Sequence, residues 1–329
     1  MSVKLPDLAD VFAARQRIGQ VVRRTPLALA PDLSEKLGTP VCLKLECLQL
    51  TGAFKARGAA NKLLSLSEDK KKRGVIAFST GNHGRAVAFL GRQLGIPAVI
   101  CLSTRVPEWR VEAMRAMGAE VVAHGVSQDE AYAKALEIQH ERGLTMVAPF
   151  DDPYVLCGQG TISLEIFEEL PDVAQIIVPL SGGGLFAGVS MAAKSIRPST
   201  KMVGVSMAVA PAMIRSLEAD KPVEIPEQDS LADALLGGIG LDNQYTFELT
   251  RRHIDQMELV SEEEIADGMF QMYDQHKLVV EGSGAVGISA VLAGKIKGPG
   301  PVVIVVSGGN ADPKVLNEIS AARYNKQEV

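Results

Sequence analysis

Lys55 and three glycine-containing segments are the residues of this chain whose types and spacing could do chemistry. The lysine lies in the run 51–59, Thr-Gly-Ala-Phe-Lys-Ala-Arg-Gly-Ala. The other segments are 79–84 (Ser-Thr-Gly-Asn-His-Gly), 181–185 (Ser-Gly-Gly-Gly-Leu) and 307–310 (Ser-Gly-Gly-Asn). A lysine alone indicates little, because the chain has 34 lysines and arginines. A lysine amine can form a Schiff base with a carbonyl compound, and together the four segments predict one active site assembled from distant parts of the chain.

The segment 181–184 follows an apolar run, 176–180, and precedes an expected helix at 185–193. Consecutive glycines let several backbone N–H groups converge, and a helix N-terminus adds positive potential, so the loop suits a phosphate. The alternative is a tight strand-to-helix turn, although three glycines cost backbone entropy. A dinucleotide loop would need an acidic residue at the end of the next strand, and Val203–Met207 contains none. The sequence therefore predicts a site for a single phosphate monoester.

Segments 79–84 and 307–310 also follow apolar runs. In 79–84, hydroxyls, an amide and the N–H groups of a helix start gather in one turn, which suits a substrate carboxylate. The alternative is an ordinary N-cap turn with Ser79 or Thr80 as the cap, and His83 by itself does not indicate acid–base catalysis. Because ligands of open α/β sheets bind at the carboxyl ends of strands, one cofactor could touch all three loops.

The four segments, in this order and spacing, resemble those of fold-type II pyridoxal-phosphate enzymes of the serine/threonine dehydratase and serine racemase family. The resemblance runs from about Arg24 to Asn310, and Phe-Lys-Ala-Arg-Gly-Ala is the dehydratase form of the lysine motif, whereas cysteine-synthase relatives usually have Lys-Asp-Arg. It implies an α/β fold of the tryptophan synthase β-like class, with two domains that each contain a mostly parallel sheet. It also implies pyridoxal 5'-phosphate as the cofactor and an amino acid as the small-molecule substrate.

By this resemblance Lys55 is the catalytic residue that holds the cofactor as a Schiff base, with Phe54 beside the ring. Asn82 would bond the ring hydroxyl and Ser307 would face the pyridine nitrogen. The cofactor phosphate is expected at the loop Ser181, Gly182, Gly183, Gly184 and Leu185. The substrate carboxylate is expected, largely through backbone N–H groups, at Ser79, Thr80, Gly81 and His83.

The reaction implied is the dehydration and deamination of a β-hydroxy amino acid. A substrate amine that displaces Lys55 frees the lysine as a base next to Cα, and the cofactor withdraws electrons from that carbon. Because Ser307 is a neutral partner for the ring nitrogen, elimination competes well against transamination. Loss of the β-hydroxyl gives an enamine that hydrolyses to a 2-oxo acid and ammonia. The expected substrate is threonine, serine or a hydroxyectoine-derived analogue.

Thr80 leaves a second function open. Related racemases have a serine at this position that acts from the second face of Cα, whereas many threonine dehydratases have alanine. A serine- or aspartate-type racemase, with Thr80 as the second acid/base, is therefore the alternative. A nicotinamide oxidoreductase is disfavoured by the missing acid in Val203–Met207, and a non-catalytic binding protein is disfavoured because Lys55 is intact.

Three further sequence features indicate which subgroup of the family this chain resembles. The motif Ser-Thr-Gly-Asn-His-Gly-Arg-Ala, which starts at Ser79, resembles that of a subgroup assigned to hydroxyectoine utilisation. Ala53 replaces the serine usually found two residues before the lysine. Ser206 stands where metal-activated relatives carry a glutamate, so we expect no metal site.

Composition sets limits on partners and location. A net charge of -5 argues against binding to nucleic acid or to an anionic membrane. The chain has no run of about 18 apolar residues that would span a membrane, and Met1–Arg17 lacks an apolar signal-peptide region. Its four cysteines show no CxxC or zinc-finger spacing, which indicates reduced core residues. We expect a cytoplasmic enzyme without a nucleic-acid or membrane partner, assembled as a homodimer or homotetramer.

Short β-branched runs alternate with helical patterns along the chain, which predicts α/β architecture with mostly parallel sheets. Expected strands are 75–78, 98–102, 120–123, 175–178, 202–206 and 302–306, and expected helices include 85–94, 109–117, 128–141 and 262–273. Gly95, Gly118 and Gly143 are expected helix stops. We predict a small substrate-clamping domain at 75–149, inserted into a large cofactor-binding domain formed by 1–74 and 150–329.

Overall fold

A computed structural model describes residues 4–79, 81–226 and 228–327. Within these ranges the strands are β1 (Leu27–Leu29), β2 (Val41–Lys44), β3 (Val75–Phe78), β4 (Ala98–Leu102), β5 (Glu120–Ala123), β6 (Thr145–Met146), β7 (Gln175–Pro179), β8 (Lys201–Met207), β9 (Gln256–Val260) and β10 (Val302–Val305). No helix in this part of the chain is both long and apolar enough to cross a membrane.

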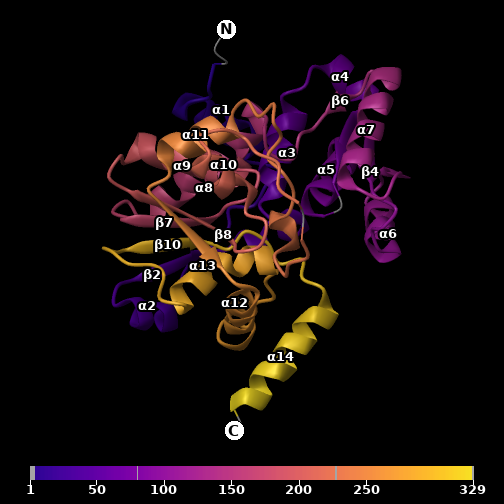
Figure 1. The fold of residues 1–329 in the computed structure, drawn as a ribbon. Helices are drawn as coiled ribbons and strands as arrows, with labels where there is room; N and C mark the ends of the chain where they lie inside the picture. Colours follow the sequence, from indigo (N-terminus) through magenta and orange to yellow (C-terminus); the bar gives the residue numbers. More distant parts are fainter. Residues whose placement is uncertain (1–3, 80, 227, 328–329) are drawn as a thin grey trace.

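Helices surround the strands (Figure 1). They are α1 (Leu8–Ile18), α2 (Pro31–Leu37), α3 (Lys55–Leu64), α4 (Glu68–Arg73), α5 (Asn82–Leu94), α6 (Glu108–Ala116), α7 (Gln128–Arg142), α8 (Pro153–Glu169), α9 (Gly184–Ile196), α10 (Ala212–Glu218), α11 (Thr246–His253), α12 (Glu262–Asp274), α13 (Gly282–Leu292) and α14 (Pro313–Gln327), with short 3-10 turns η1 (Glu46–Leu48), η2 (Leu50–Gly52) and η3 (Asp233–Leu235).

The larger sheet has the strand order β1-β2-β10-β7-β8-β9. Its pairs are parallel except for β1, which runs antiparallel to β2. β10 lies at the centre, where Val303 pairs with Cys42 on one side and Ile176 on the other. The strands β7 and β10 are fully buried, as expected for parallel strands that are covered on both faces. Their neighbouring positions bring together the two loops that follow them, 181–184 and 307–310.

The smaller sheet has the order β5-β4-β3-β6 and is parallel throughout. All four strands fall within 75–149, and in Figure 1 its helices α5, α6 and α7 lie together at one side of the molecule. The hydrophobic cluster around this sheet also contains Ile18, Ala56 and Leu63 from α1 and α3. The sheets are thus separate, but α3 packs with the smaller one. The domain boundaries that we predicted stay a prediction.

The predicted elements are confirmed, with small differences at their ends. All six predicted strands form, and the helices expected at 85–94 and 128–141 extend to Asn82–Leu94 and Gln128–Arg142. The sequence reading missed β1, β2, β6 and β9. Gly95, Gly118 and Gly143 all have positive φ, at 68°, 92° and 62°, where glycine has no Cβ penalty.

Helices α3 and α8 approach so closely that glycine is required at their contact. A Cβ on Gly158 would lie 2.6 Å from the carbonyl oxygen of Arg57 and 2.7 Å from Cα of Gly58. A Cβ on Gly58 would lie 2.5 Å from Nε2 of Gln159. Because real Cβ atoms do not approach other atoms this closely, a larger residue at either position would push the two helices apart. The start of α3 is thereby held against α8.

Candidate active site

The Lys55 segment is bonded directly to the segment that follows β10. The amide of Phe54 donates to the carbonyl of Ser307 at 3.0 Å, and the amide of Gly309 donates to Gly52 at 2.9 Å. An isolated bridge between Ala53 and Gly308 completes this contact. Lys55 is the first residue of α3, so these bonds fix the position from which its side chain departs.

The side chain of Lys55 projects into a cavity rather than into solvent. Its Nζ donates to the carbonyl of Pro149 at 2.6 Å and lies 5.2 Å from the centre of the Phe54 ring. Burial lowers the pKa of Lys55 to about 8, although the negative charge of Glu281 opposes the shift. An amine with this pKa is partly neutral near physiological pH, as a nucleophile or a base must be.

Asn82, at the start of α5, is held by two neighbours. Its Nδ2 donates to Oε1 of Glu281 at 2.7 Å, and its Oδ1 accepts from Nδ2 of Asn310 at 2.7 Å. Asn310 also donates to the carbonyl of Thr51 at 2.8 Å. The side-chain amide of Asn310 therefore links the segments 51–59, 79–84 and 307–310. Both amide atoms of Asn82 are oriented by these bonds, and its remaining N–H can serve a ligand.

Glu281 is a site residue that the sequence reading missed. It is the N-cap residue of α13 and is buried beside the loop after β10, where a Cβ on Gly308 would lie 2.2 Å from its Oε1. Burial and the charge of Asp233 raise the pKa of Glu281 to about 7, against the opposing bond from Asn82. The available signal was an acidic residue directly before the glycine-rich helix start 282–284.

His83 is a neutral residue in this site. Burial, and then the charge of Lys55, lower its pKa to about 3. Its Nε2 lies 2.8 Å from the carbonyl of Val147, so the proton is on Nε2 and Nδ1 is left as an acceptor. Among the described residues Nδ1 is buried without a hydrogen-bond partner. The imidazole is therefore suited to accepting a bond and unsuited to donating a proton at neutral pH.

The loop between β7 and α9 has the form of an anion cradle. Gly183 has a φ of +86°, which favours glycine. A Cβ on Gly182 would lie 2.6 Å from the ring of Phe150, and one on Gly184 would lie 2.8 Å from Cβ of Phe150. Because α9 begins at Gly184, its first N–H groups are free of helical partners and could bind an anion in the loop.

Ser307 and Ser206 have different surroundings. Ser307 is buried, lines the cavity and has its Oγ 3.4 Å from the carbonyl of Ser283. Its hydroxyl is neutral and can either donate or accept. Ser206 is buried within β8. Among the residues that the structure describes, no group of three histidine, cysteine or acidic side chains is arranged to hold a metal ion.

One cavity of about 1060 Å³ collects the predicted residues. It is lined by Phe54, Lys55, Ser79, Gly81, Asn82, His83, Ser181, Gly182, Gly183, Gly184, Leu185 and Ser307. Thr80 lies outside the described residues. The sequence reading missed several lining residues besides Glu281, namely Arg85, Arg110, Tyr132, Pro149, Phe150, Asp151 and Asp233. Apart from Arg85, which lies in the motif quoted from Ser79 but was assigned no role there, these residues carried no motif, and only the fold brings them to the cavity.

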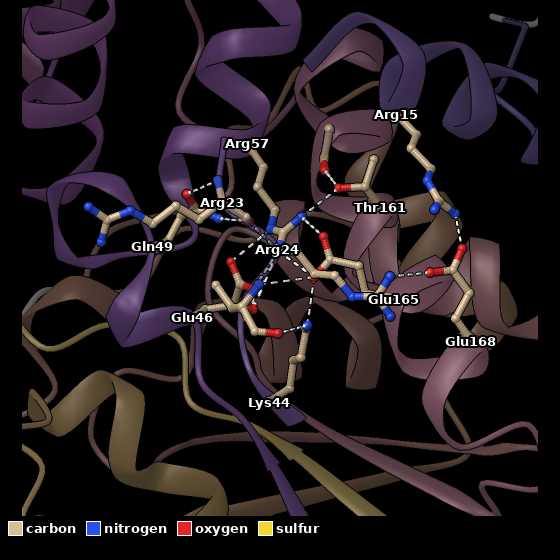
Figure 2. Close-up of polar contacts among 12 residues, drawn as sticks. Arg15, Arg23, Arg24, Lys44, Glu46, Gln49, Arg57, Thr161, Glu165 and Glu168 are labelled. Carbon is tan, nitrogen blue, oxygen red and sulfur yellow. Dashed lines mark hydrogen bonds and ion pairs between the residues drawn. The ribbon is translucent and has the colours of Figure 1, made fainter. Parts of the chain in front are cut away.

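Arg57, two residues after Lys55 on α3, belongs to a buried ionic cluster (Figure 2) that holds this helix in place. Arg57 donates from Nε and NH2 to the two carboxylate oxygens of Glu46, both at 2.8 Å. It donates from NH1 and NH2 to those of Glu165, at 2.6 and 2.8 Å. Lys44 donates to Glu165 at 2.6 Å, and Thr25 donates to Glu46 at 2.5 Å. The charges of two cations and two carboxylates therefore cancel, as the burial of ionic side chains requires.

The residues of the cavity fit pyridoxal phosphate. An aldehyde needs a neutral amine, and Lys55 has a lowered pKa. A phosphate monoester needs converging N–H groups, which the loop 181–184 supplies at the start of α9. The volume of the cavity is also ample for a cofactor with a small substrate.

The family is decided by a comparison of sequences. The sequence model described as "Pyridoxal-phosphate dependent enzyme" matches residues 18–308. The chain belongs to this family. Pyridoxal phosphate is its cofactor, and the predicted fold class, cofactor and family are confirmed.

Similar proteins in the pyridoxal-phosphate family include dehydratases and racemases. A putative threonine dehydratase of Sinorhizobium fredii is 47% identical over 313 residues, which cover 95% of this chain and 94% of that protein. An L-threonine ammonia-lyase of Thermotoga maritima is 45% identical over 95% of this chain and 77% of that protein. The structure of maize serine racemase superposes with a TM-score of 0.91 at 32% identity, covering 99% of this chain and 100% of that one. The subgroup for hydroxyectoine, the oligomeric state and the cellular location stay predictions.

Proposed function

We propose that this pyridoxal-phosphate enzyme is an ammonia-lyase that removes water and then ammonia from a β-hydroxy amino acid such as threonine or serine. The observation that carries the proposal is the Lys55 amine, with its lowered pKa, in one cavity with the glycine loop. The similarity to threonine dehydratases at 45–47% identity supports the choice of reaction. The products are a 2-oxo acid and ammonia.

In this proposal the protein positions both ends of the cofactor. The loop 181–184 holds the phosphate, and Asn82 donates its remaining N–H to the ring hydroxyl. Ser307 would offer a neutral hydroxyl to the ring nitrogen, and Phe54 would pack beside the ring. When bound, the cofactor supplies an electron sink for the substrate Cα. The amide of Asn82 is available because Glu281 and Asn310 orient it.

Lys55 moves the proton. Once the substrate amine has taken its place, the free lysine removes the proton from Cα, and its lowered pKa makes this possible near neutral pH. The backbone N–H groups of Ser79, Gly81 and His83 would hold the substrate carboxylate. The hydroxyl leaves the β-carbon with a proton as water. The enamine that results takes up one water during hydrolysis, so the amino acid is converted to its 2-oxo acid and ammonia.

Racemisation is the second candidate, supported by the superposition with maize serine racemase. It needs an acid on the face of Cα opposite Lys55, and Thr80, in the segment 79–84, has a hydroxyl in a suitable place along the sequence. Its β-branched side chain restricts χ1, which limits its reach. We therefore place elimination first and assign racemisation a lower rate.

The test is a substrate panel with the Lys55→Ala variant as its control. Serine, threonine, 3-hydroxyaspartate and a hydroxyectoine-derived substrate are assayed for 2-oxo acid, ammonia and chirality. The wild type should form 2-oxo acid and ammonia, with a visible chromophore that borohydride reduces onto the protein. Lys55→Ala should retain the fold and lose both. A D-product formed faster than the 2-oxo acid would make the racemase the correct function, and a reducible adduct in the variant would place the cofactor on another lysine.

A further inference from the structure

Arg85 is a cation of the cavity that no part of the proposed reaction uses. It lies in the first turn of α5, three residues after Asn82, and lines the cavity. Residues three apart share one face of a helix, and helical side chains lean toward the N-terminus. The guanidinium therefore extends on the same face as Asn82 and back toward the end of α5 where the substrate carboxylate is proposed to bind.

The guanidinium of Arg85 has unused bonding capacity. Its Nε is buried, and within the described residues it has no hydrogen-bond partner. Burial lowers the pKa of Arg85, and the positive charge of Arg110 adds to this effect, although the charge of Glu281 opposes it. Arg85 as a whole is half-buried, but a buried N–H without a bonded acceptor is costly. An anion that enters the cavity would remove this cost.

The other charged groups of the cavity are already engaged. Lys55 donates to Pro149, and Arg110 pairs with Asp233 at 3.3 Å. Asp151 accepts three backbone N–H bonds at the start of α11, at 2.7, 2.9 and 2.8 Å. Glu281 accepts from Asn82. The remaining lining acids, Glu224 and Asp242, are exposed. Arg85 is thus left to bind a group that the substrate brings.

We infer that Arg85 is a specificity-determining residue that binds a carboxylate on the side chain of the substrate. The inference rests on the proposed elimination reaction and names its substrate class, β-hydroxy amino acids with an acidic side chain. Three residues of helix, a rise of about 4.5 Å, separate Arg85 from Asn82, next to which the α-carboxylate would bind. This spacing suits the two carboxylates of a four-carbon acid such as 3-hydroxyaspartate. A planar guanidinium binds a carboxylate through two parallel bonds.

The reaction on such a substrate balances as before. The β-hydroxyl leaves as water, hydrolysis of the enamine consumes one water, and the products are a dicarboxylic 2-oxo acid and ammonia. Arg85 does not take part in either proton transfer. It holds the distal carboxylate while Lys55 acts at Cα.

The test compares the wild-type holoenzyme with Arg85→Gln, Arg85→Lys and a matched control, Arg92→Gln. Arg92 lies on the same helix, is exposed, and is absent from the lining of the cavity. We measure kcat/KM for threonine and for both diastereomers of 3-hydroxyaspartate. Charge-assisted bonds of this kind correspond to about 10- to 100-fold in binding. Arg85→Gln should therefore lower the ratio of hydroxyaspartate to threonine kcat/KM by about that factor, Arg85→Lys should restore part of it, and Arg92→Gln should leave it unchanged.

A binding measurement without turnover separates this inference from the proposed function. Calorimetry with succinate and with butyrate compares two four-carbon acids that differ in the second carboxylate. Wild type should bind succinate more tightly than Arg85→Gln does, by a similar factor, and butyrate should not distinguish the two proteins. Absence of 2-oxo acid and ammonia from every substrate would refute the proposed function, while the succinate result would still decide the role of Arg85.

Two results would overturn the inference. Equal losses of kcat/KM for threonine and hydroxyaspartate in Arg85→Gln would assign the guanidinium to the α-carboxylate. Equal succinate affinity in wild type and Arg85→Gln, with both proteins folded by circular dichroism, would show that Arg85 binds no substrate carboxylate.

Discussion

Replacing Arg57 with methionine should cost the protein far more than the loss of one side chain's contacts. In the cluster of Figure 2, Arg57 has a side chain 1% exposed and makes two bonds to each of Glu46 and Glu165. Methionine fills similar volume without charge, so Lys44 alone would face two carboxylates. Breaking a buried ion pair from one side costs about 3–5 kcal/mol. We expect the free energy of unfolding of Arg57→Met to fall by about this amount at pH 8.

The loss should depend on pH in a defined direction. In the wild type, burial raises the pKa of Glu165, but the bond and charge of Arg57, with the charge of Lys44, outweigh it and leave the pKa lowered. This contribution to stability is present above the unfolded pKa of glutamate and is lost as pH falls through the folded value. In Arg57→Met the arginine no longer offsets the effect of burial on the pKa, so the pKa of a carboxyl in the cluster is raised. That carboxyl keeps its proton in the folded protein, and the free energy of unfolding therefore falls as pH rises. The two proteins should therefore differ least near pH 4 and most near pH 8.

Urea unfolding of the holoenzyme across this pH range is the assay, with Arg24→Met as the matched control. Arg24 pairs with Glu168 and Glu169, but its side chain is 51% exposed, so its removal should cost about 0–1 kcal/mol. The double variant Arg57→Met/Glu165→Gln removes one charge of each sign and should recover part of the loss. A deficit in Arg57→Met that does not change with pH would refute the reasoning, because it would come from packing alone.

Two further predictions concern the cofactor, and a third concerns metal ions. Gly183→Ala places a Cβ at a residue with positive φ and 2.6 Å from Cε of Met213. Spectral titration should therefore show pyridoxal phosphate bound at least about tenfold more weakly. Unchanged affinity would contradict a role for the loop. The capture of the cofactor by apoenzyme should accelerate with a midpoint near pH 8, the pKa of Lys55. Glu281→Gln should lower that midpoint, because the carboxylate of Glu281 raises the pKa of Lys55. A midpoint near 10.5 in the wild type would show that the buried amine of Lys55 is not the group that captures the cofactor. Dialysis against a strong chelator should leave the activity of the holoenzyme nearly unchanged, because Ser206 offers a neutral hydroxyl where a hard cation prefers a carboxylate; restoration of a several-fold loss by magnesium would show ligands elsewhere.

The parts of the site that could be predicted from sequence are those marked by glycine or polar residues at the ends of helices and strands. Lys55, Asn82 and the glycine loop stand directly after or before regular elements, and a glycine run at a strand end has a physical reason that is visible in one segment. Strands such as β10 were predicted because four consecutive apolar residues are typical of parallel strands. The short strands β1 and β6, of three and two residues, carry too little periodicity to be seen.

The parts that sequence could not predict depend on contacts between distant segments. Glu281 has a raised pKa only because the fold buries it beside Asp233 and Asn82. Arg85 lies in the motif that starts at Ser79, but nothing in the sequence gives its side chain a role until α5 is placed beside the cavity. Arg57 was recognised as part of a motif, but its partners Glu46 and Glu165 lie 11 and 108 residues away.

The glycine contact between α3 and α8 has a consequence for how the enzyme is built to move. Because Gly58 and Gly158 bring two backbones together, the lysine is mounted on a rigid frame that also includes the centre of the larger sheet. Helix α5 packs on α3 through the hydrophobic cluster of the smaller sheet, whereas its first turn reaches the loop after β10 through the side-chain bonds of Asn82 to Glu281 and Asn310. We therefore expect the backbone at Lys55 to keep its position from one substrate to another, and the side chains of Asn82 and Arg85 to account for most of the adjustment.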